Sequence, residues 1–199
     1  MQRVPVDIAP TTLCADELGV ALSDYLNTWL TQLKKKGWTM PDMLVKLYNL
    51  RNNWNFISEQ EQQGIEIRKP VGPEKKLIVN WVEETFFDAW ASEIDIAISN
   101  KPITCFIAIK NRELIGFSCY DATALGYFGP MGVKETFQGR GTGKALLMAC
   151  LLDMKLKGYG YAIIGAVEVQ EFYGKAVDAL EIPESSPGIL KTWLKKNRK

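Results

Sequence analysis

The sequence predicts a fold of the α/β class (α+β), in which helices and strands alternate along one main domain. Two observations support this prediction. Residues 65–190 carry short segments with the period-two pattern of strands, placed between segments with helical periodicity. A glycine-rich stretch, QGRGTGK at 138–144, separates an apolar strand-like run from a long apolar helix pattern. Glycines there let the backbone approach a ligand closely, so this stretch is the first candidate site.

The beginning of the chain has the pattern of helices. Apolar residues recur at helical spacing over residues 13–36 and are followed by a glycine suited to a C-cap. A short helix with proline in its first turn is predicted over residues 39–50, and another over roughly 54–63. We therefore expect a helical N-terminal extension over residues 1–64 and a main domain over residues 65–199.

The main domain begins with a change from helical to alternating pattern. Its strands are marked by alternating or continuous apolar runs, and its helices by apolar stripes with glycine or proline at their ends. The predicted elements are, in order, a strand at 65–67, a helix from 72 to about 90, strands at 103–109 and 114–120 joined by a turn at Asn111 and Arg112, a strand at 125–133, a helix at about 141–157, a strand at 161–167, a helix at 169–180 and a turn-rich edge at 181–190.

Composition excludes several classes of partner. A hydrophobic fraction of 47% in 199 residues is enough for one domain with a sizeable core and an appendage. The net charge of +1 argues against a nucleic-acid partner and against a polybasic membrane surface. No apolar run is long enough to span a membrane, and residues 1–30 lack the pattern of a signal peptide. We expect a cytoplasmic protein with no nucleic-acid or membrane partner.

Histidine is absent from the chain, and its four cysteines form no CxxC pair. A His-ligated zinc and a Ser-His or Cys-His relay are therefore excluded, and we expect no metal. Cys105 and Cys119 lie in strand-like runs and Cys150 in an apolar helix pattern, which favours buried free thiols.

The glycine loop fits neither of two common phosphate motifs. A P-loop would need glycine at Gln138 and serine or threonine at Ala145. The dinucleotide pattern GxGxxG fails in both registers, because Lys144 and Leu146 stand where its third glycine should be. A nucleotide-phosphate binder is therefore disfavoured.

The spacing that does fit is (R/Q)xxGx(G/A), with Gln138, Gly141 and Gly143, after a strand that ends in MGV at 131–133. In this motif the chain resembles the GNAT acetyltransferase superfamily, and the resemblance covers about residues 65–190. It implies the GNAT acyltransferase fold, a mixed central sheet with helices on both faces. It also implies that the strand before the glycine loop is splayed from its neighbour.

The resemblance implies acetyl-CoA as cosubstrate. Backbone groups of Met131, Gly132 and Val133 would hold the pantetheine arm and the acetyl carbonyl. The glycine loop would cradle the pyrophosphate, mainly through main-chain N–H groups, while its two cations are either phosphate contacts or plain surface charges. The loop residues are Gln138, Gly139, Arg140, Gly141, Thr142, Gly143 and Lys144.

Two catalytic roles follow from the resemblance. Tyr173 matches the tyrosine that many GNAT enzymes place near the sulfur as general acid; the alternative is a tyrosine that packs its ring beside Phe172. A general base is expected because an alkyl amine is almost fully protonated at neutral pH. Asp121 is the first choice for it. The other candidates are Glu83, Glu84, Glu135 and Glu168, and each could instead be a solvated carboxylate.

These residues predict an N-acetyltransferase that moves an acetyl group directly to a primary amine in a ternary complex. The acceptor is a small molecule or a peptide. The alternative is a coenzyme A-binding module without catalysis, which acts as a sensor or a scaffold. For residues 1–39 the alternatives are a helix that forms a homodimer, a helix that packs on the domain, and a lid.

Overall fold

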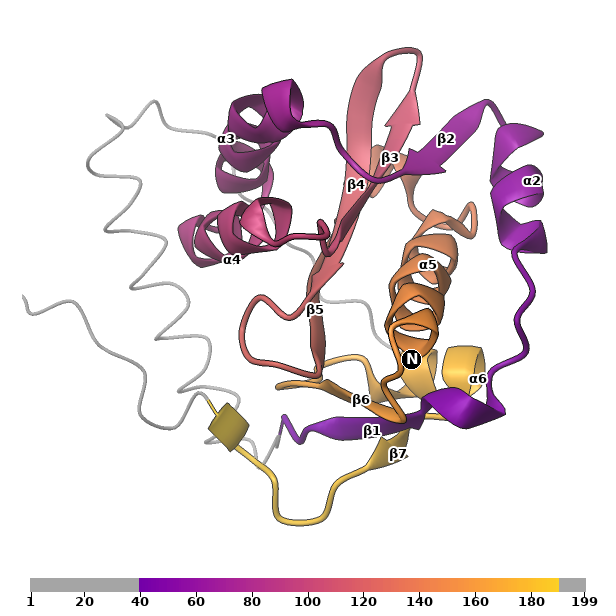
Figure 1. Ribbon diagram of the computed structural model, residues 1–199, viewed down its shortest axis with the longest axis vertical. Helices are drawn as coiled ribbons and strands as arrows, with labels where there is room; N and C mark the ends of the chain where they lie inside the picture. The colour runs from indigo at the N-terminus through magenta and orange to yellow at the C-terminus, as the bar shows by residue number, and fades with distance from the viewer. Residues whose placement is uncertain (1–39, 190–199) are drawn as a thin grey trace, which may run out of the picture. The chain divides into compact units, whose positions relative to one another are not determined.

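The computed structural model describes residues 40–189, and a seven-stranded mixed sheet forms their centre (Figure 1). The strand order is β2-β3-β4-β5-β6-β1-β7. All neighbouring strands are antiparallel except β5 and β6, which are parallel. The strands are β1 Met43–Lys46, β2 Ile65–Arg68, β3 Cys105–Lys110, β4 Glu113–Tyr120, β5 Tyr127–Val133, β6 Tyr161–Ile164 and β7 Leu180–Glu181. The helix predicted at 13–36 lies outside the described residues.

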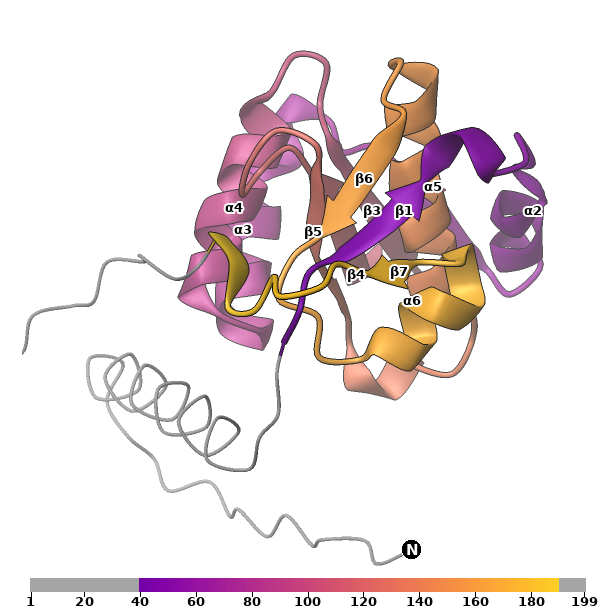
Figure 2. The ribbon, with the colours of Figure 1, turned by 90° about the horizontal axis from the view of Figure 1, so that it is seen from below.

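Helices cover both faces of the sheet, as predicted (Figure 2). On one face α3 and α4 pack against β3 and β4. On the other face α5 fills the centre of the core, with α2 and α6 beside it. The helices are α2 Asn55–Glu61, α3 Lys75–Thr85, α4 Asp88–Ser99, α5 Thr142–Leu156 and α6 Gln170–Val177.

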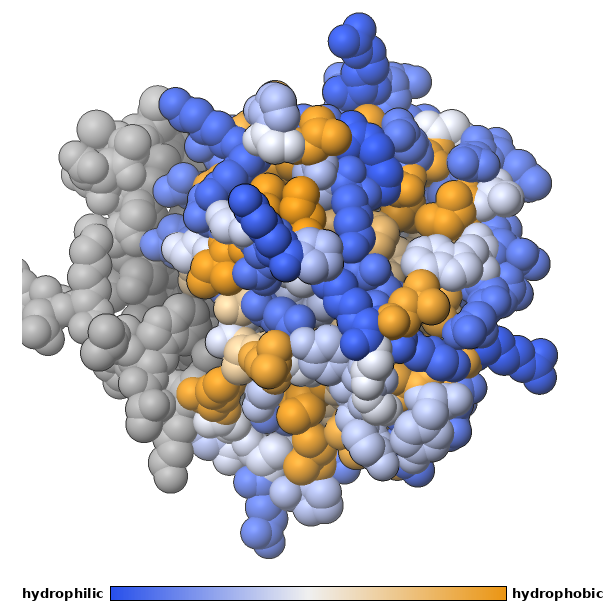
Figure 3. Space-filling model, in the orientation of Figure 1, coloured by the Kyte–Doolittle hydropathy of each residue, from blue (hydrophilic) through white to orange (hydrophobic). Residues whose placement is uncertain are grey.

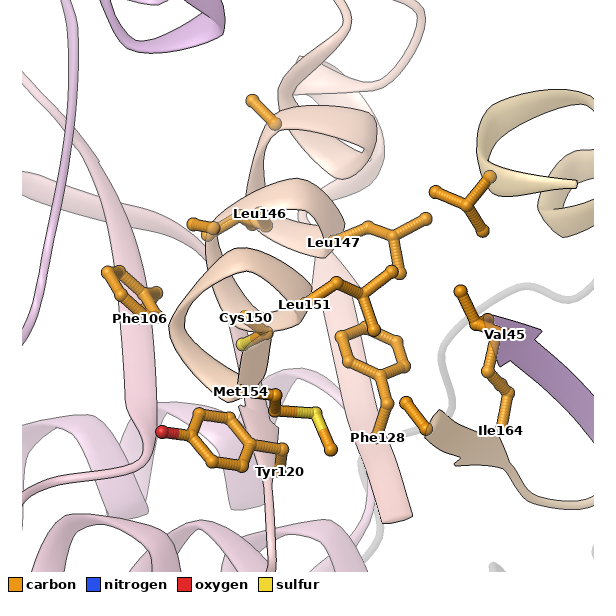
Figure 4. Packing of buried hydrophobic residues seen from close by; sticks show 14 of the residues in the cluster. Val45, Phe106, Tyr120, Phe128, Leu146, Leu147, Cys150, Leu151, Met154 and Ile164 are labelled. Atoms are coloured by element: carbon orange, nitrogen blue, oxygen red, sulfur yellow. The ribbon is translucent and has the colours of Figure 1, made fainter. Parts of the chain in front are cut away.

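The central helix α5 is apolar on nearly every side, which is the pattern of a helix buried in a core. Its side chains Leu146, Leu147 and Leu151 lie between the sheet and the outer elements (Figure 4). Cys150 is also buried there, and Cys105 and Cys119 are buried free thiols, so the prediction for these cysteines is confirmed. The N-terminus of this helix lies beside the end of β5, where a Cβ atom at Gly143 would be 3.8 Å from Cγ2 of Val133.

The helix predicted over residues 39–50 is wrong. Residues 43–46 form β1, which inserts between β6 and β7, and residues 47–49 form one 3₁₀ turn. Met43, Val45 and Leu47 are buried, and their alternation is that of a strand. The compact unit that contains the sheet begins at Met40.

The prediction of a single helix from 72 to about 90 is also wrong, because the helix is interrupted between α3 and α4. Phe86 leaves the helical conformation, with φ −128° and ψ −97°. Its ring lies against Trp90 and Phe117, with centroids 5.5 Å and 5.6 Å away. Burial of this ring outweighs helical continuation, and a second helix follows as far as Ser99.

The strand before the glycine loop is splayed from its parallel neighbour, as predicted. β5 pairs with β6 only at Tyr127 and Phe128, opposite Ile163 and Ile164. Residues 131–133 of β5 pair with β4 alone, and the β4–β5 register shifts at residues 129–130. The sheet is therefore split between β5 and β6, towards the glycine loop.

Candidate functional site

The split exposes one backbone edge of β5. The N–H of Lys134 donates to the carbonyl of Ile115 on β4 at 2.8 Å. Since hydrogen-bonding groups along a strand alternate in direction, the N–H groups of Met131 and Val133 face away from β4, into the split. The backbone of Gly132 faces β4. Of the three predicted residues, two therefore offer backbone groups to a ligand in the split.

Gly132 has a different function, which is steric. A Cβ atom at this position would lie 2.6 Å from Cζ of Phe86, far inside contact distance. The ring of Phe86 therefore rests on the bare backbone of β5. Beside it lies a surface pocket with a volume of about 480 Å³. Its lining residues are Thr85, Phe86, Val133, Lys134, Glu135, Thr136 and Gln138.

The glycine loop ends in a cradle of backbone N–H groups. Gly139 and Gly141 have φ of 75° and 80°, a region that side chains disfavour. The first intrahelical bond of α5 runs from Ala145 N to Gly141 O, at 2.9 Å. The N–H groups of residues 142–144 therefore have no partner within the helix, and they lie at the positive end of its dipole. This arrangement suits an anion such as a pyrophosphate.

The side chains of the loop contribute less than its backbone. Gln138 donates through Nε2 to the carbonyl of Val133 at 3.1 Å, which ties the loop to β5. Arg140 stacks over the ring of Phe137, with 5.5 Å to the centroid. Arg140 and Lys144 are exposed, and neither forms an ion pair with another described residue.

A residue that the sequence did not indicate holds the loop from behind. Gln60 of α2 is only 3% exposed. Its Nε2 donates to the carbonyl of Arg140 at 3.1 Å, and its Oε1 accepts from the hydroxyl of Thr142 at 2.8 Å. Gln63 adds a bond to the same carbonyl at 3.3 Å. A glutamine in a surface-like helix gives no signal of this contact, because its partners are distant in sequence.

Tyr173 of α6 lies at the other end of the split. Its ring is 6.4 Å from that of Phe128, the last residue of β5 that pairs with β6, and 5.0 Å from that of Phe172. Burial raises the pKa of the Tyr173 hydroxyl to about 12. The phenol is therefore protonated at neutral pH and keeps a proton to donate.

Asp121 lies in the turn after β4, where both of its carboxylate oxygens are engaged. One accepts from the N–H of Gly126 at 2.7 Å and the other from the hydroxyl of Tyr159 at 2.8 Å. These contacts shape the turn between β4 and β5 and do not favour the base role, which stays a prediction. The alternative candidates Glu83, Glu84, Glu135 and Glu168 are exposed carboxylates, and Glu135 lines the pocket.

Another carboxylate, Glu93 of α4, has a hydrogen bond and a shifted pKa. The hydroxyl of Thr123, in the turn between β4 and β5, donates to its Oε1. Desolvation raises the pKa of the Glu93 carboxyl, against the opposing effect of the Thr123 hydrogen bond. The helix predicted from the sequence ends at about residue 90, so Glu93 was not expected in a helix; in the structure α4 continues to Ser99.

The described residues show neither a metal-binding cluster nor a membrane-spanning helix. Residues 40–189 contain no group of three or more acidic, cysteine or histidine residues that could hold a metal ion. None of their helices has the length and apolar character needed to cross a bilayer. On the face seen in Figure 3, apolar side chains form small patches separated by polar ones.

Part of the chain is similar to a known family. Residues 101–176 match a family model described as the acetyltransferase (GNAT) domain. The matched residues run from before β3 to α6, so they include the split, the glycine loop and Tyr173. Gln60 and Glu93 lie outside them.

Solved structures share the fold of the GNAT domain. A glucosamine N-acetyltransferase region of a fungal multi-domain β-N-acetylglucosaminidase matches 78% of this chain and 22% of its own, at 14% identity and a TM-score of 0.58. A GCN5-related N-acetyltransferase from Sphaerobacter thermophilus matches 78% of this chain and 53% of its own, at 19% identity and a TM-score of 0.52. The chain thus spans about a fifth and about half of these proteins. A comparison with curated protein sequences gave no match.

Proposed function

We propose that the protein is an acetyl-CoA-dependent N-acetyltransferase that acts on a primary amine of a small molecule or peptide. The observation that carries this proposal is a continuous path of free backbone groups. It begins at the N-terminus of α5 and continues along the open edge of β5. An anion cradle that leads into an unpaired strand edge suits a ligand with a pyrophosphate followed by an amide-bearing arm. Acetyl-CoA has that structure.

Different residues along this path would bind different parts of acetyl-CoA. The N–H groups of residues 142–144 would hold the pyrophosphate, with Arg140 and Lys144 close enough in sequence to add charge at its rim. The backbone groups of Met131 and Val133 would pair with the pantetheine arm and the acetyl carbonyl. A backbone N–H aimed at the carbonyl oxygen stabilises the oxyanion formed on attack, an effect of about 2.7–4 kcal/mol per donor.

The reaction joins the amine nitrogen to the thioester carbon as the carbon–sulfur bond breaks. An amine with a pKa of about 10.4 must lose a proton, which costs roughly 4–5 kcal/mol at neutral pH. The departing thiolate must gain a proton, and the hydroxyl of the partly buried Tyr173 is the donor that we assign. Its raised pKa keeps it protonated until the thiolate forms beside it.

The first test is binding of acetyl-CoA by calorimetry, followed by thiol release from acetyl-CoA with a panel of primary amines and peptides. We expect micromolar binding and transfer to at least one acceptor. No binding at millimolar acetyl-CoA refutes the proposal. Binding without transfer to any acceptor instead supports a coenzyme A-binding module without catalysis.

The second test is Tyr173→Phe, which removes the hydroxyl and keeps the ring packing against Phe128. We expect kcat to fall by about 10²-fold or more, while the Kd for acetyl-CoA changes little. An unchanged kcat would exclude Tyr173 as the proton donor.

A further inference from the structure

We propose that Glu93 is the general base of this reaction, the group that takes the proton from the acceptor amine. The inference rests on the proposed acetyl transfer. It concerns a residue of α4, outside the loop, the strand edge and the tyrosine considered so far.

The position of α4 places Glu93 over the split strand. One turn before it, Trp90 packs on Phe117, with ring centroids 6.1 Å apart, and Phe117 is the β4 partner of Gly132. One turn after it, the carbonyl of Ala97 accepts from the N–H of Thr104, before β3. Glu93 therefore lies between these two contacts, on the α4 side of the sheet.

The helix that carries Glu93 reaches the first residues of the split. Ile94, the next residue of α4, is buried in the same apolar cluster as Cys119. The Sγ of Cys119 lies 3.3 Å from the carbonyl oxygen of Gly129 and 3.4 Å from that of Pro130. Pairing with β6 stops just before these residues. Helix α4 thus packs beside the part of β5 that precedes Met131, where the acetyl group is expected, and Thr123 in the turn before β5 holds the Glu93 carboxylate.

The surroundings of Glu93 suit a base. Thr123 donates to Oε1, and no described residue donates to Oε2, which is left for an amine or an intervening water. Glu93 forms no ion pair with a described residue. Partial burial raises its pKa, against the opposing effect of the Thr123 hydrogen bond, and a carboxylate with a raised pKa is a stronger proton acceptor.

Other carboxylates with little exposure have contacts of their own. Asp121 accepts hydrogen bonds at both oxygens, as described above. Asp153 accepts through Oδ2 from the hydroxyl of Tyr120 at 2.5 Å and pairs with Lys69 at 2.6 Å. Asp42, which is 6% exposed, accepts through Oδ1 from the N–H of Ala166 at 2.9 Å. The Glu93 side chain, on the α4 side of the split, has the Thr123 hydroxyl as its only partner among the described residues.

The proton balance of the step is complete. The acceptor, an ammonium at neutral pH, first loses one proton to solvent. The neutral amine nitrogen then forms its bond to the thioester carbon and gives its second proton to Oε2 of Glu93, directly or through a water. The carbon–sulfur bond breaks, and the thiolate takes the proton of the Tyr173 hydroxyl. Glu93 then releases its proton to solvent, and Tyr173 regains one from solvent.

The test compares Glu93→Gln with Thr123→Val and Glu61→Gln, using the full chain, acetyl-CoA and the best acceptor from the amine panel. Glu93→Gln removes the base and keeps an amide oxygen that can accept from Thr123, whereas Thr123→Val removes that hydrogen bond and keeps the carboxylate. Glu61→Gln is a matched change on exposed surface. Calorimetry with acetyl-CoA shows that each variant is folded and binds the donor.

We expect Glu93→Gln to lower kcat by about 10²- to 10³-fold with the Kd for acetyl-CoA within twofold of wild type, and to remove the acidic limb of the pH–rate profile. Thr123→Val should stay within about fivefold of wild type, and Glu61→Gln within about twofold. The inference is overturned if Glu93→Gln keeps kcat within threefold, or if Thr123→Val loses as much rate as Glu93→Gln, which would indicate a purely structural contact. Absence of transfer by the wild-type protein refutes the proposed function itself, so the two failures are distinguishable.

Discussion

Replacement of Gln60 by leucine tests whether α2 holds the pyrophosphate loop in its binding conformation. The variant puts an apolar side chain of similar size in place of the glutamine, whose residue is only 3% exposed, and removes both of its hydrogen bonds. The carbonyl of Arg140 keeps a bond from Gln63 at 3.3 Å. The hydroxyl of Thr142, whose residue is 1% exposed, loses its acceptor.

The magnitude follows from that unpartnered hydroxyl. A buried polar group left without its hydrogen bond costs about 1–3 kcal/mol, so we expect the free energy of unfolding to fall by about 2 kcal/mol. The loop also gains freedom that acetyl-CoA must remove on binding. If the binding conformation of the loop is destabilised by about 1.4 kcal/mol relative to its other conformations, the Kd for acetyl-CoA rises about tenfold.

Chemical denaturation and calorimetry with acetyl-CoA measure the two effects separately. Gln62→Leu, an exposed neighbour on α2's C-terminal end, is the control and should change neither value. Gln60→Leu combined with Thr142→Val removes both partners and should recover most of the stability. A Kd within twofold of wild type, together with the loss of stability, would show that Gln60 supports the fold and not the loop, and would refute the reasoning.

Three further predictions follow from single contacts. Gly132→Ala places a Cβ atom 2.6 Å from the ring of Phe86 and should lower the free energy of unfolding by about 1–3 kcal/mol in urea titrations; an unchanged midpoint would contradict the close packing. Gly141→Ala imposes a side chain at φ 80° and should weaken acetyl-CoA binding by about tenfold in calorimetry, for a cost of about 1–2 kcal/mol. Glu74 accepts two hydrogen bonds from Arg68, at 2.6 and 2.9 Å, which hold its pKa at about 2 instead of 4.5. This contribution is complete above pH 4.5 and is lost as the pH falls through 2, so Glu74→Gln should cost about 1 kcal/mol at pH 7 and converge with wild type near pH 2, as followed by thermal unfolding; a constant difference across that range would exclude it.

The glycine loop is a feature that could be predicted from neighbouring residues in the sequence. Positive φ at Gly139 and Gly141, and a helix that begins at residue 142, are properties of a few adjacent residues. The strand before the loop and the apolar helix after it have strong patterns of their own. These features were predicted because each depends on neighbours in the chain, and the spacing of Gln138, Gly141 and Gly143 was sufficient to suggest the family.

The elements that were mispredicted depend on distant partners. Residues 43–46 have apolar positions compatible with helix or strand, and the free edge of β6 decides for strand by antiparallel pairing. Phe86 ends α3 because its ring fits on a glycine of β5, a contact that no window of the sequence contains. Long-range burial and pairing outweigh local propensity at both places.

The sequence by itself thus determined the class of fold, the conformation of the glycine loop and the presence of a tyrosine on α6. Only the tertiary structure decided which backbone groups of β5 face the split and that Asp121 is engaged in a turn. It also brought Gln60 to Thr142, 82 residues away, and Glu93 to Thr123, 30 residues away. The physical reason is that a backbone motif is encoded by adjacent residues, whereas the partners of a side chain are set by the packing of whole elements.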